Sequence, residues 1–434
     1  MQNKARIYKI LIIFLGLFIV SSLIVSYFFL FSNAKNKNLD YIPENAIIKA
    51  RINGKVLIGK SIENICFENP DSKLLTQLDT LIQQTLRTDI KNTGIDYLSE
   101  IGVFVTEING TYNYFLLLNI DDKNEFNSYF SNTTSYKYAI SKDGEVGIVQ
   151  LNFDSFSNLK NDYLKTILNK KSSLKFKEND FKNDITIESE GFTSSSKNDN
   201  FKLNCNFFGD RIIINGKFNN QVNSTKEKFS LIKNGLHFSI SEPTILNRIS
   251  ELIKIYNPSF PELNHLEMNY RGMSLTEGGN PYFAEPDFDL LISCKNKINQ
   301  DSILNFVNKY NDFGFSYQNN KLSMGKSLYN LDVYDNKHLF ITKKKSSIAQ
   351  KTNNNLFEIN GSPDLLTKIK APEYITSFFE MMTPYAASKS YLSSIDDFNL
   401  TVTKRSFKSE IIFKKKKNSF QELLKAFLIV KGIQ

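Results

Sequence analysis

An unbroken run of apolar or small residues, Ile10–Phe31, places the strongest constraint on this chain, because it decides which solvent the remaining residues meet. At about 1.5 Å of rise per residue, some twenty apolar residues in a helix span the roughly 30 Å hydrocarbon core of a bilayer. We therefore predict a transmembrane anchor over residues 10–31. A cytoplasmic N-terminus at residues 1–9 precedes it, and a linker at residues 32–40 follows.

Basic residues give this predicted anchor a direction. Lys4, Arg6 and Lys9 precede the apolar run, whereas the lysines that follow it are soon offset by acidic residues. The positive-inside rule then predicts a bacterial inner-membrane protein with its N-terminus inside and its C-terminal domains extracytoplasmic or periplasmic. The alternative is a cleaved signal peptide, for which Ser32-Asn33-Ala34 offers a weak small-residue site. The length of the run favours the uncleaved anchor.

The composition indicates an ordered exterior and a bacterial genome of low G+C content. The chain of 434 residues contains 36 Phe and 20 Tyr but only 10 Pro, so it holds enough apolar surface to build cores. This length predicts two or three domains. The net charge of +9 governs solubility and nonspecific attraction, and the predicted compartment argues against a nucleic-acid partner.

The exported region contains similar segments that indicate internal repeats. Pro243 aligns with Pro363 at an offset of 120 residues, and the apolar residues after each proline align as well. Each proline follows a short apolar strand and suits the first position of a helix, where its missing N–H is not needed. A weaker third copy begins at Ala46. Each copy continues into two strands and a helix, so each unit reads β-α-β-β-α.

These repeats predict an α+β fold: an N-terminal transmembrane helix followed by repeated β-α-β-β-α units with antiparallel sheets. Residues 41–232 would form a first α+β unit that contains an all-β insertion at about 174–220. Residues 233–350 would form the second unit, and residues 351–434 a third, shorter one. In the first unit, Asn109-Gly110 between two apolar runs predicts a tight hairpin.

The sequence supplies no catalytic, cofactor-binding or metal-ligating residue, and it predicts no cofactor. His237, His265 and His338 are the only histidines, and no two of them lie within one turn or strand. The motifs of zinc proteases, serine hydrolases and phosphate-binding loops are absent. Pairs of the S-x-x-K type occur three times without the elements that complete such a site, as composition alone would produce: Ser157/Lys160, Ser194/Lys197 and Ser230/Lys233.

The charged clusters and the cysteines can each be interpreted as structural or as functional residues. Asp121-Asp122, Asp287-x-Asp289 and Asp396-Asp397 lack the spacing of a calcium loop and are typical of solvated turns and strand edges. The runs Lys343–Lys345 and Lys414–Lys417 indicate either strand-edge protection or contact with anionic headgroups or envelope polymers. The three cysteines are far apart: Cys66, Cys205 and Cys294. The last two suit buried strand positions, and a disulfide between two of the three stays open.

The segment Tyr41-Ile42-Pro43-Glu44-Asn45-Ala46 resembles the opening of uncharacterised bacterial families. Their mature regions begin with a Tyr-(Val/Ile)-Pro-x-(Asp/Asn)-Ala strand just after a membrane or signal segment. The resemblance covers about a dozen residues and implies an exported repeat architecture. It implies no activity and no site residues.

Together these patterns predict a single-pass, membrane-anchored extracytoplasmic protein that acts as a non-catalytic binding or scaffold component of the cell envelope. Its predicted partners are the membrane, envelope proteins or anionic envelope polymers. Two alternatives remain open. One is an envelope hydrolase or transferase whose site is assembled from distant residues, for example by pairing His265 with a carboxylate. The other is a carrier of lipids or other hydrophobic ligands, which an apolar cavity would favour.

Overall fold

The computed structural model forms two compact units, Met1–Lys197 and Asn198–Gln434. The residues that it describes are 37–67, 93–108, 110–131, 136–151, 161–172, 176–177, 180, 182–189, 201–218, 229–275, 284–309, 315–324, 327–343, 348–349, 355–367, 369–370, 392–414, 419 and 422. The unit boundaries predicted near residues 232 and 350 therefore fall inside the second unit. The predicted insertion at 174–220 is divided between the two units.

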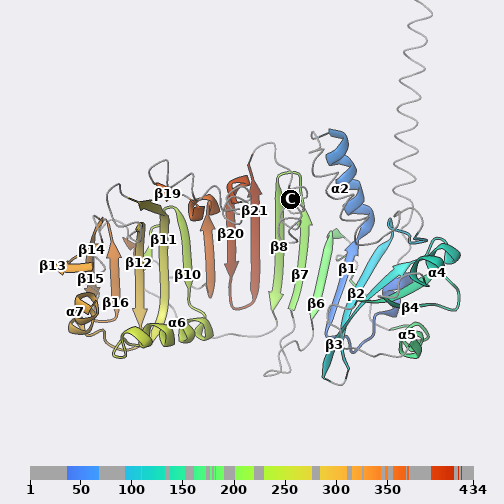
Figure 1. Cartoon of the computed structure of the whole chain (residues 1–434), viewed down its shortest axis with the longest axis horizontal. Coiled ribbons are helices and arrows are strands. Elements are labelled where there is room, and N and C mark those ends of the chain that lie inside the picture. The colour runs from blue at the N-terminus through green and yellow to red at the C-terminus, as the bar shows by residue number, and fades with distance from the viewer. Residues whose placement is uncertain are drawn as a thin grey trace, which may run out of the picture. The chain divides into compact units, whose positions relative to one another are not determined.

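The first unit is built on an antiparallel sheet with the strand order β6-β1-β2-β3-β5-β4 (Figure 1). Its strands are β1 (Ile48–Asn53), β2 (Glu100–Ile108), β3 (Thr111–Asn119), β4 (Lys137–Ile140), β5 (Val146–Leu151) and β6 (Ile185–Ser189). Its helices are the 3-10 helix η1 (Lys37–Tyr41) and the α-helices α2 (Gly54–Phe67), α4 (Lys123–Ser131) and α5 (Asn161–Leu168). The hairpin predicted at Asn109-Gly110 is confirmed, since β2 pairs with β3 there and Gly110 has a φ of 75°.

Apolar side chains cover both faces of this first sheet. On one face, Phe104 and Phe115 stack with ring centroids 4.8 Å apart and pack with η1 and α5. On the other face, Leu118 and Val149 pack against the aromatic side of α4. The Asp122 carboxylate begins α4 by accepting hydrogen bonds from the N–H groups of Asn124 and Glu125.

The second unit contains a longer sheet with the order β7-β8-β21-β20-β18-β10-β11-β12-β16-β15-β14-β13, in which neighbouring strands are antiparallel. Its strands are β7 (Phe201–Phe207), β8 (Arg211–Phe218), β10 (Leu236–Ile240), β11 (Leu263–Leu275), β12 (Ala284–Cys294), β13 (Phe315–Gln318), β14 (Lys321–Met324), β15 (Ser327–Tyr334), β16 (His338–Thr342), β18 (Phe357–Gly361), β20 (Ile395–Val402) and β21 (Ser406–Phe413). The short β19 (Ile369–Lys370) pairs in parallel with the end of β11. A separate ribbon joins β9 (Ser230–Leu231) to β17 (Ile348–Ala349).

Of the two helices of this unit in the described residues, α6 (Pro243–Tyr256) lies at one end of β10–β12, and α7 (Gln300–Lys309) lies beside β13 (Figure 1). The sequence defines the start of α6 clearly: the Glu242 side chain accepts a hydrogen bond from Ile245 N–H at 2.7 Å, and Pro243 follows at the first helical position. Apolar residues of both helices pack on the strands in one core cluster, which includes Leu246, Ile303 and Val307.

The predicted fold class, a transmembrane helix followed by repeated β-α-β-β-α units, is wrong. Most of the structure is large antiparallel sheet, with 51% strand against 24% helix. The strand that precedes Pro363, β18, pairs with β10 of the supposed second unit, and β8 of the supposed insertion pairs with β21. Pro363 itself begins only the five-residue 3-10 helix η6 (Pro363–Thr367). The similar segments at Pro243 and Pro363 therefore follow neighbouring strands of one sheet and do not begin separate units.

No helix among the described residues is both long and apolar enough to span a bilayer. The anchor predicted at residues 10–31 lies outside the described residues, as do most of the predicted linker and the N-terminus at 1–9.

Candidate functional site

The burial pattern of β11 is inverted relative to an ordinary half-solvated sheet. In such a sheet, apolar side chains face the core and polar side chains face water. Along β11 the polar His265, Glu267 and Asn269 are all 0% exposed, whereas Leu266 and Met268 are only half-buried. The adjacent strand β10 shows the same arrangement. The second unit therefore buries a polar face and leaves part of its apolar face only half-buried.

The buried polar face is organised around His265. Ser241 Oγ lies 2.6 Å from His265 Nδ1, and His265 Nε2 lies 3.0 Å from Glu267 Oε1. The tautomer that satisfies both contacts carries its proton on Nε2, which donates to Glu267, while Nδ1 accepts from the Ser241 hydroxyl. The other Glu267 oxygen accepts hydrogen bonds from Leu231 N–H at 2.6 Å and from the Ser230 hydroxyl at 3.1 Å.

Ser241, His265 and Glu267 have the connectivity of a hydrolytic triad, but they are closed to substrate. Ser241 is 1% exposed, and the other two side chains are fully buried. Burial alone would raise the pKa of Glu267, yet the hydrogen bonds from His265 and from Leu231 N–H hold it below its usual value. The ionised carboxylate thus fixes the β9 segment over β11, which is a structural role.

The opposite, apolar face contains a pocket of about 250 Å³ between α6, α7 and the sheet. Ten of its eleven lining residues are apolar, and the exception, Asn257, is the C-terminal cap of α6. The lining residues are Ile253, Asn257, Phe260, Phe288, Ile292, Ile303, Val307, Leu322, Leu331, Leu339 and Ile341. An apolar pocket of this kind favours an apolar occupant.

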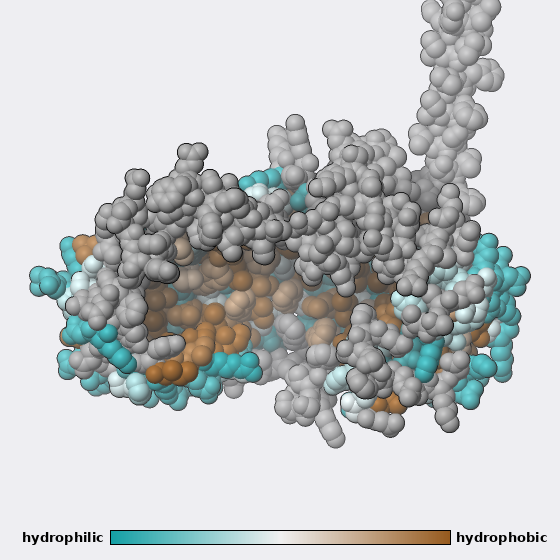
Figure 2. Space-filling view, viewed as in Figure 1, coloured by the Kyte–Doolittle hydropathy of each residue, from teal (hydrophilic) through white to brown (hydrophobic). Residues whose placement is uncertain are grey.

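Strand register connects this pocket to the half-buried apolar face of β11. Ile292 and Phe288 line the pocket and pair with Leu266 and Tyr270 of β11, so all four side chains share one face. Figure 2 shows apolar side chains gathered in a hollow over β10–β12 and around α6. Apolar surface therefore continues from the pocket onto the neighbouring strands.

The structure brings the three histidines onto one side of the second sheet, although the sequence separates them. His265 and His338 both pair with Ser293 of β12, and His237 contacts Asn269 at 2.8 Å. Each is buried, and none of them lines the apolar pocket.

The remaining residues considered in the sequence have structural contacts or lie outside the description. Ser230 bonds to Glu267, and Lys233 pairs with Glu358. The other two S-x-x-K pairs, together with residues 344–345 and 415–417, lie outside the described residues. No group of His, Cys, Asp or Glu among the described residues could hold a metal ion.

The acidic pairs also have protein partners. Asp287 and Asp289 flank Arg271, whose guanidinium lies 2.8 and 2.6 Å from their carboxylate oxygens. Asp397 accepts a hydrogen bond from the Asn399 amide. Because the Arg271 guanidinium occupies Asp287 and Asp289, a bound cation is not needed there.

Cys205 and Cys294 are free thiols, half-buried and buried respectively, and the Cys66 side chain lies outside the description. Sequence reasoning did not single out Ser241, Glu267 or any residue of the apolar pocket. The one available signal was the alternation of polar and apolar residues along β11, and that pattern does not say which face is buried.

Comparison with known proteins gives no family for this chain: no protein-family model and no curated protein matches it. Crystal form III of TP0453 shares 12% identity over 72% of this chain and 93% of that chain, with a TM-score of 0.19. Crystal form I of the same protein shares 11% identity over 74% and 94%, again with a TM-score of 0.19. A similarity at this level carries no argument about fold or function.

Proposed function

We propose that this protein is a non-catalytic, extracytoplasmic binding component of the bacterial cell envelope, and that its ligand is an apolar chain held beneath α6 and α7. The observation that supports this proposal is the pocket wall, which has a single polar residue and continues into half-buried apolar strand residues. A structural core alone would be filled, because protein interiors pack at crystal-like density with few voids larger than a water molecule.

The pocket volume limits the size of the ligand. At about 250 Å³ it exceeds the ~150 Å³ apolar cavity that suffices to bind benzene. It is smaller than the ~300–1,000 Å³ pockets of drug-sized molecules. A short acyl chain, or the end of a longer one, matches this size. Each methylene buried there contributes about 0.8 kcal/mol.

The outer surface of α6 extends the apolar region beyond the pocket. Leu252 is 60% exposed and Ile255 is 70% exposed, and both lie on the side of α6 that faces away from the pocket-lining Ile253. Exposed aliphatic side chains beside an apolar cavity mark a binding surface more often than an isolated exposed residue does.

Photocrosslinking tests the proposal directly. The full-length protein in detergent is labelled with a diazirine-bearing dodecanoic acid, and the labelled peptides are identified by mass spectrometry. We expect labels on α6, α7, β12 and β15. Val307→Phe fills the pocket and should remove them, whereas Val333→Phe, in the same core cluster but outside the pocket lining, should keep them.

Two results would overturn the proposal: labelling confined to residues 10–31, or equal labelling of the two variants. Thermal melting of both variants shows whether either has lost its fold.

A hydrolytic function is the second candidate. The contacts of His265 with Ser241 and Glu267 favour it, and the burial of all three side chains opposes it.

A further inference from the structure

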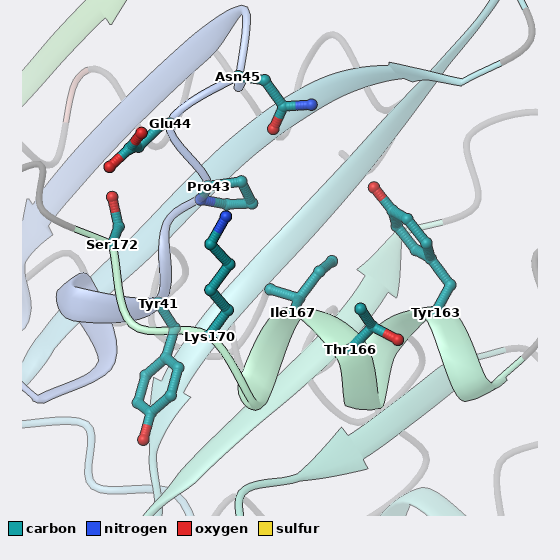
Figure 3. Close-up of a pocket in the computed structure, with 9 residues that line it drawn as sticks. All are labelled: Tyr41, Pro43, Glu44, Asn45, Tyr163, Thr166, Ile167, Lys170 and Ser172. Atoms are coloured by element: carbon teal, nitrogen blue, oxygen red, sulfur yellow. The ribbon is translucent and has the colours of Figure 1, made fainter.

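A second pocket, in the first unit, is built from the segment on which the family resemblance rests. Residues Tyr41–Asn45 form one wall of this cleft of about 380 Å³. Tyr163, Thr166 and Ile167 of α5, with Lys170 just after it, form the other wall. Figure 3 shows Lys170 reaching toward Pro43 while the Tyr163 ring stands at the opposite end. The apolar-ligand proposal does not involve this cleft.

Backbone hydrogen bonds fix the first wall. Ser172 N–H donates to the Asp40 carbonyl at 2.6 Å, and Ile47 N–H donates to the Val105 carbonyl at 2.8 Å. Between these two points, Tyr41 and Ile42 are buried in the core with α5. The wall is therefore preformed, which lowers the entropic cost of binding.

The cleft has an apolar base and polar side chains at its edge, here called the floor and the rim. Pro43, Ile167 and the Tyr163 ring form the floor, and the ring is supported by Phe115 at a centroid distance of 6.4 Å. The rim carries the Asn45 amide and the Lys170 ammonium, both exposed and without a partner in the described part of the chain. A mostly apolar surface with a few convergent polar groups is the usual form of a small-molecule site.

The rim chemistry selects the class of ligand. Among the lining residues Glu44 offsets the charge of Lys170, which leaves the cleft wall itself without a net charge. One further ammonium, that of Lys171, lies 5.7 Å from the Tyr41 ring, and a single uncompensated lysine is a weak site for a phosphate or a polyanion. The cleft walls are a helix and a loop with no strand edge, so an extended peptide cannot bind there by adding a strand. A sugar ring matches both surfaces, because its C–H face packs on Tyr and Pro while its hydroxyl and acetamido groups both donate and accept hydrogen bonds.

The geometry points to a saccharide site in the Tyr41–Asn45/α5 cleft, with N-acetylated amino sugars as the ligand class. Tyr163 supplies the stacking surface, and Asn45 and Lys170 supply the hydrogen bonds.

Saturation-transfer NMR and calorimetry on the full chain with tri-N-acetylchitotriose test this site. We expect binding by the wild type and a loss of about tenfold in Tyr163→Ala, which corresponds to about 1.4 kcal/mol. Asn45→Ala changes an exposed side chain, so a loss of affinity in that variant does not depend on folding. The matched control is Tyr112→Ala, at an exposed tyrosine on β3 outside the cleft.

Three outcomes would overturn the inference: no binding by the wild type, equal losses in Tyr163→Ala and Tyr112→Ala, or binding of an acidic peptide or inorganic phosphate in place of the saccharide. None of them bears on the apolar pocket of the second unit, whose labelling is measured separately.

Discussion

Glu267 accepts a hydrogen bond from His265 at 3.0 Å in a place where neither side chain is exposed to solvent. A buried carboxylate with both oxygens hydrogen-bonded is costly to neutralise, because a proton would remove an acceptor that its neighbours need. The pair therefore links the stability of the second unit to pH.

The first prediction concerns acid stability. The folded pKa of Glu267 lies below its ordinary value of 4.5, so its contribution is fully present above that value and is lost as pH falls through the folded pKa. Glu267→Gln should lower the free energy of unfolding by about 2 kcal/mol at pH 7. It should also flatten the fall in stability below about pH 4.5. Urea unfolding from pH 3 to pH 7 measures both effects, with Glu251→Gln on the exposed side of α6 as the control.

The second prediction concerns the buried ion pair of the first unit. Arg51 is 0% exposed and lies 2.7 Å from Glu100, whose pKa is raised by burial despite this neighbour. Arg51→Met leaves the buried Glu100 carboxylate without its charged partner. It should lower the free energy of unfolding by about 3–5 kcal/mol at neutral pH. The loss should shrink as pH falls, because the raised pKa of Glu100 lets the folded state take up a proton. Denaturant unfolding of this variant and of the exposed Lys142→Met checks the difference; equal losses would contradict it.

The third prediction tests whether Ser241 is a structural hydrogen-bonding residue or a reactive nucleophile. Because Ser241 is closed to solvent, a fluorophosphonate probe should leave it unlabelled in the folded protein. Ser241→Ala should lower stability by about 1–2 kcal/mol through the lost hydrogen bond to His265. Intact-mass measurement after probe treatment reads the labelling. A single adduct that disappears in Ser241→Ala would restore the hydrolase hypothesis.

The fourth prediction addresses compartment. If the basic residues before Ile10–Phe31 set the orientation, trypsin added outside spheroplasts should cleave the chain at exposed sites such as Lys170. A cytoplasmic protein of the same cells serves as the lysis control. Protection of the region beyond residue 40 would contradict the extracytoplasmic proposal.

Local structure was the part of this fold that the sequence specified well. Pro243 begins α6, the short apolar strand expected before Pro243 is β10, and Asn109-Gly110 joins β2 to β3. Each of these features depends on residues within a few positions of one another. The pairing of β10 with β18 depends on residues more than a hundred positions apart, and alternation along a strand does not name its partner.

The same limit applies to the candidate site. Its wall draws on helices and strands that are distant in sequence, and each contributes only one or two ordinary aliphatic or aromatic residues. Ile303 and Val307 look like core positions of an amphipathic helix, which they are. The space between them and Leu331 exists only once the sheet has formed.

The fifth prediction concerns the length of the apolar chain that the pocket of the second unit accepts. Leu331 is 2% exposed and lines the apolar pocket, so Leu331→Ala lengthens the cavity by a few carbon atoms. In competition against the photoreactive dodecanoic acid, the preferred chain should grow by two or three carbons relative to the wild type. The substitution removes buried methylenes and should cost about 2–5 kcal/mol of stability. If that unfolds the chain, Ile341→Val at the same wall makes a smaller cavity at about 0.5–1.5 kcal/mol. An unchanged length preference in both folded variants would mean that the chain binds elsewhere, since a ligand that fills the pocket must respond to its depth.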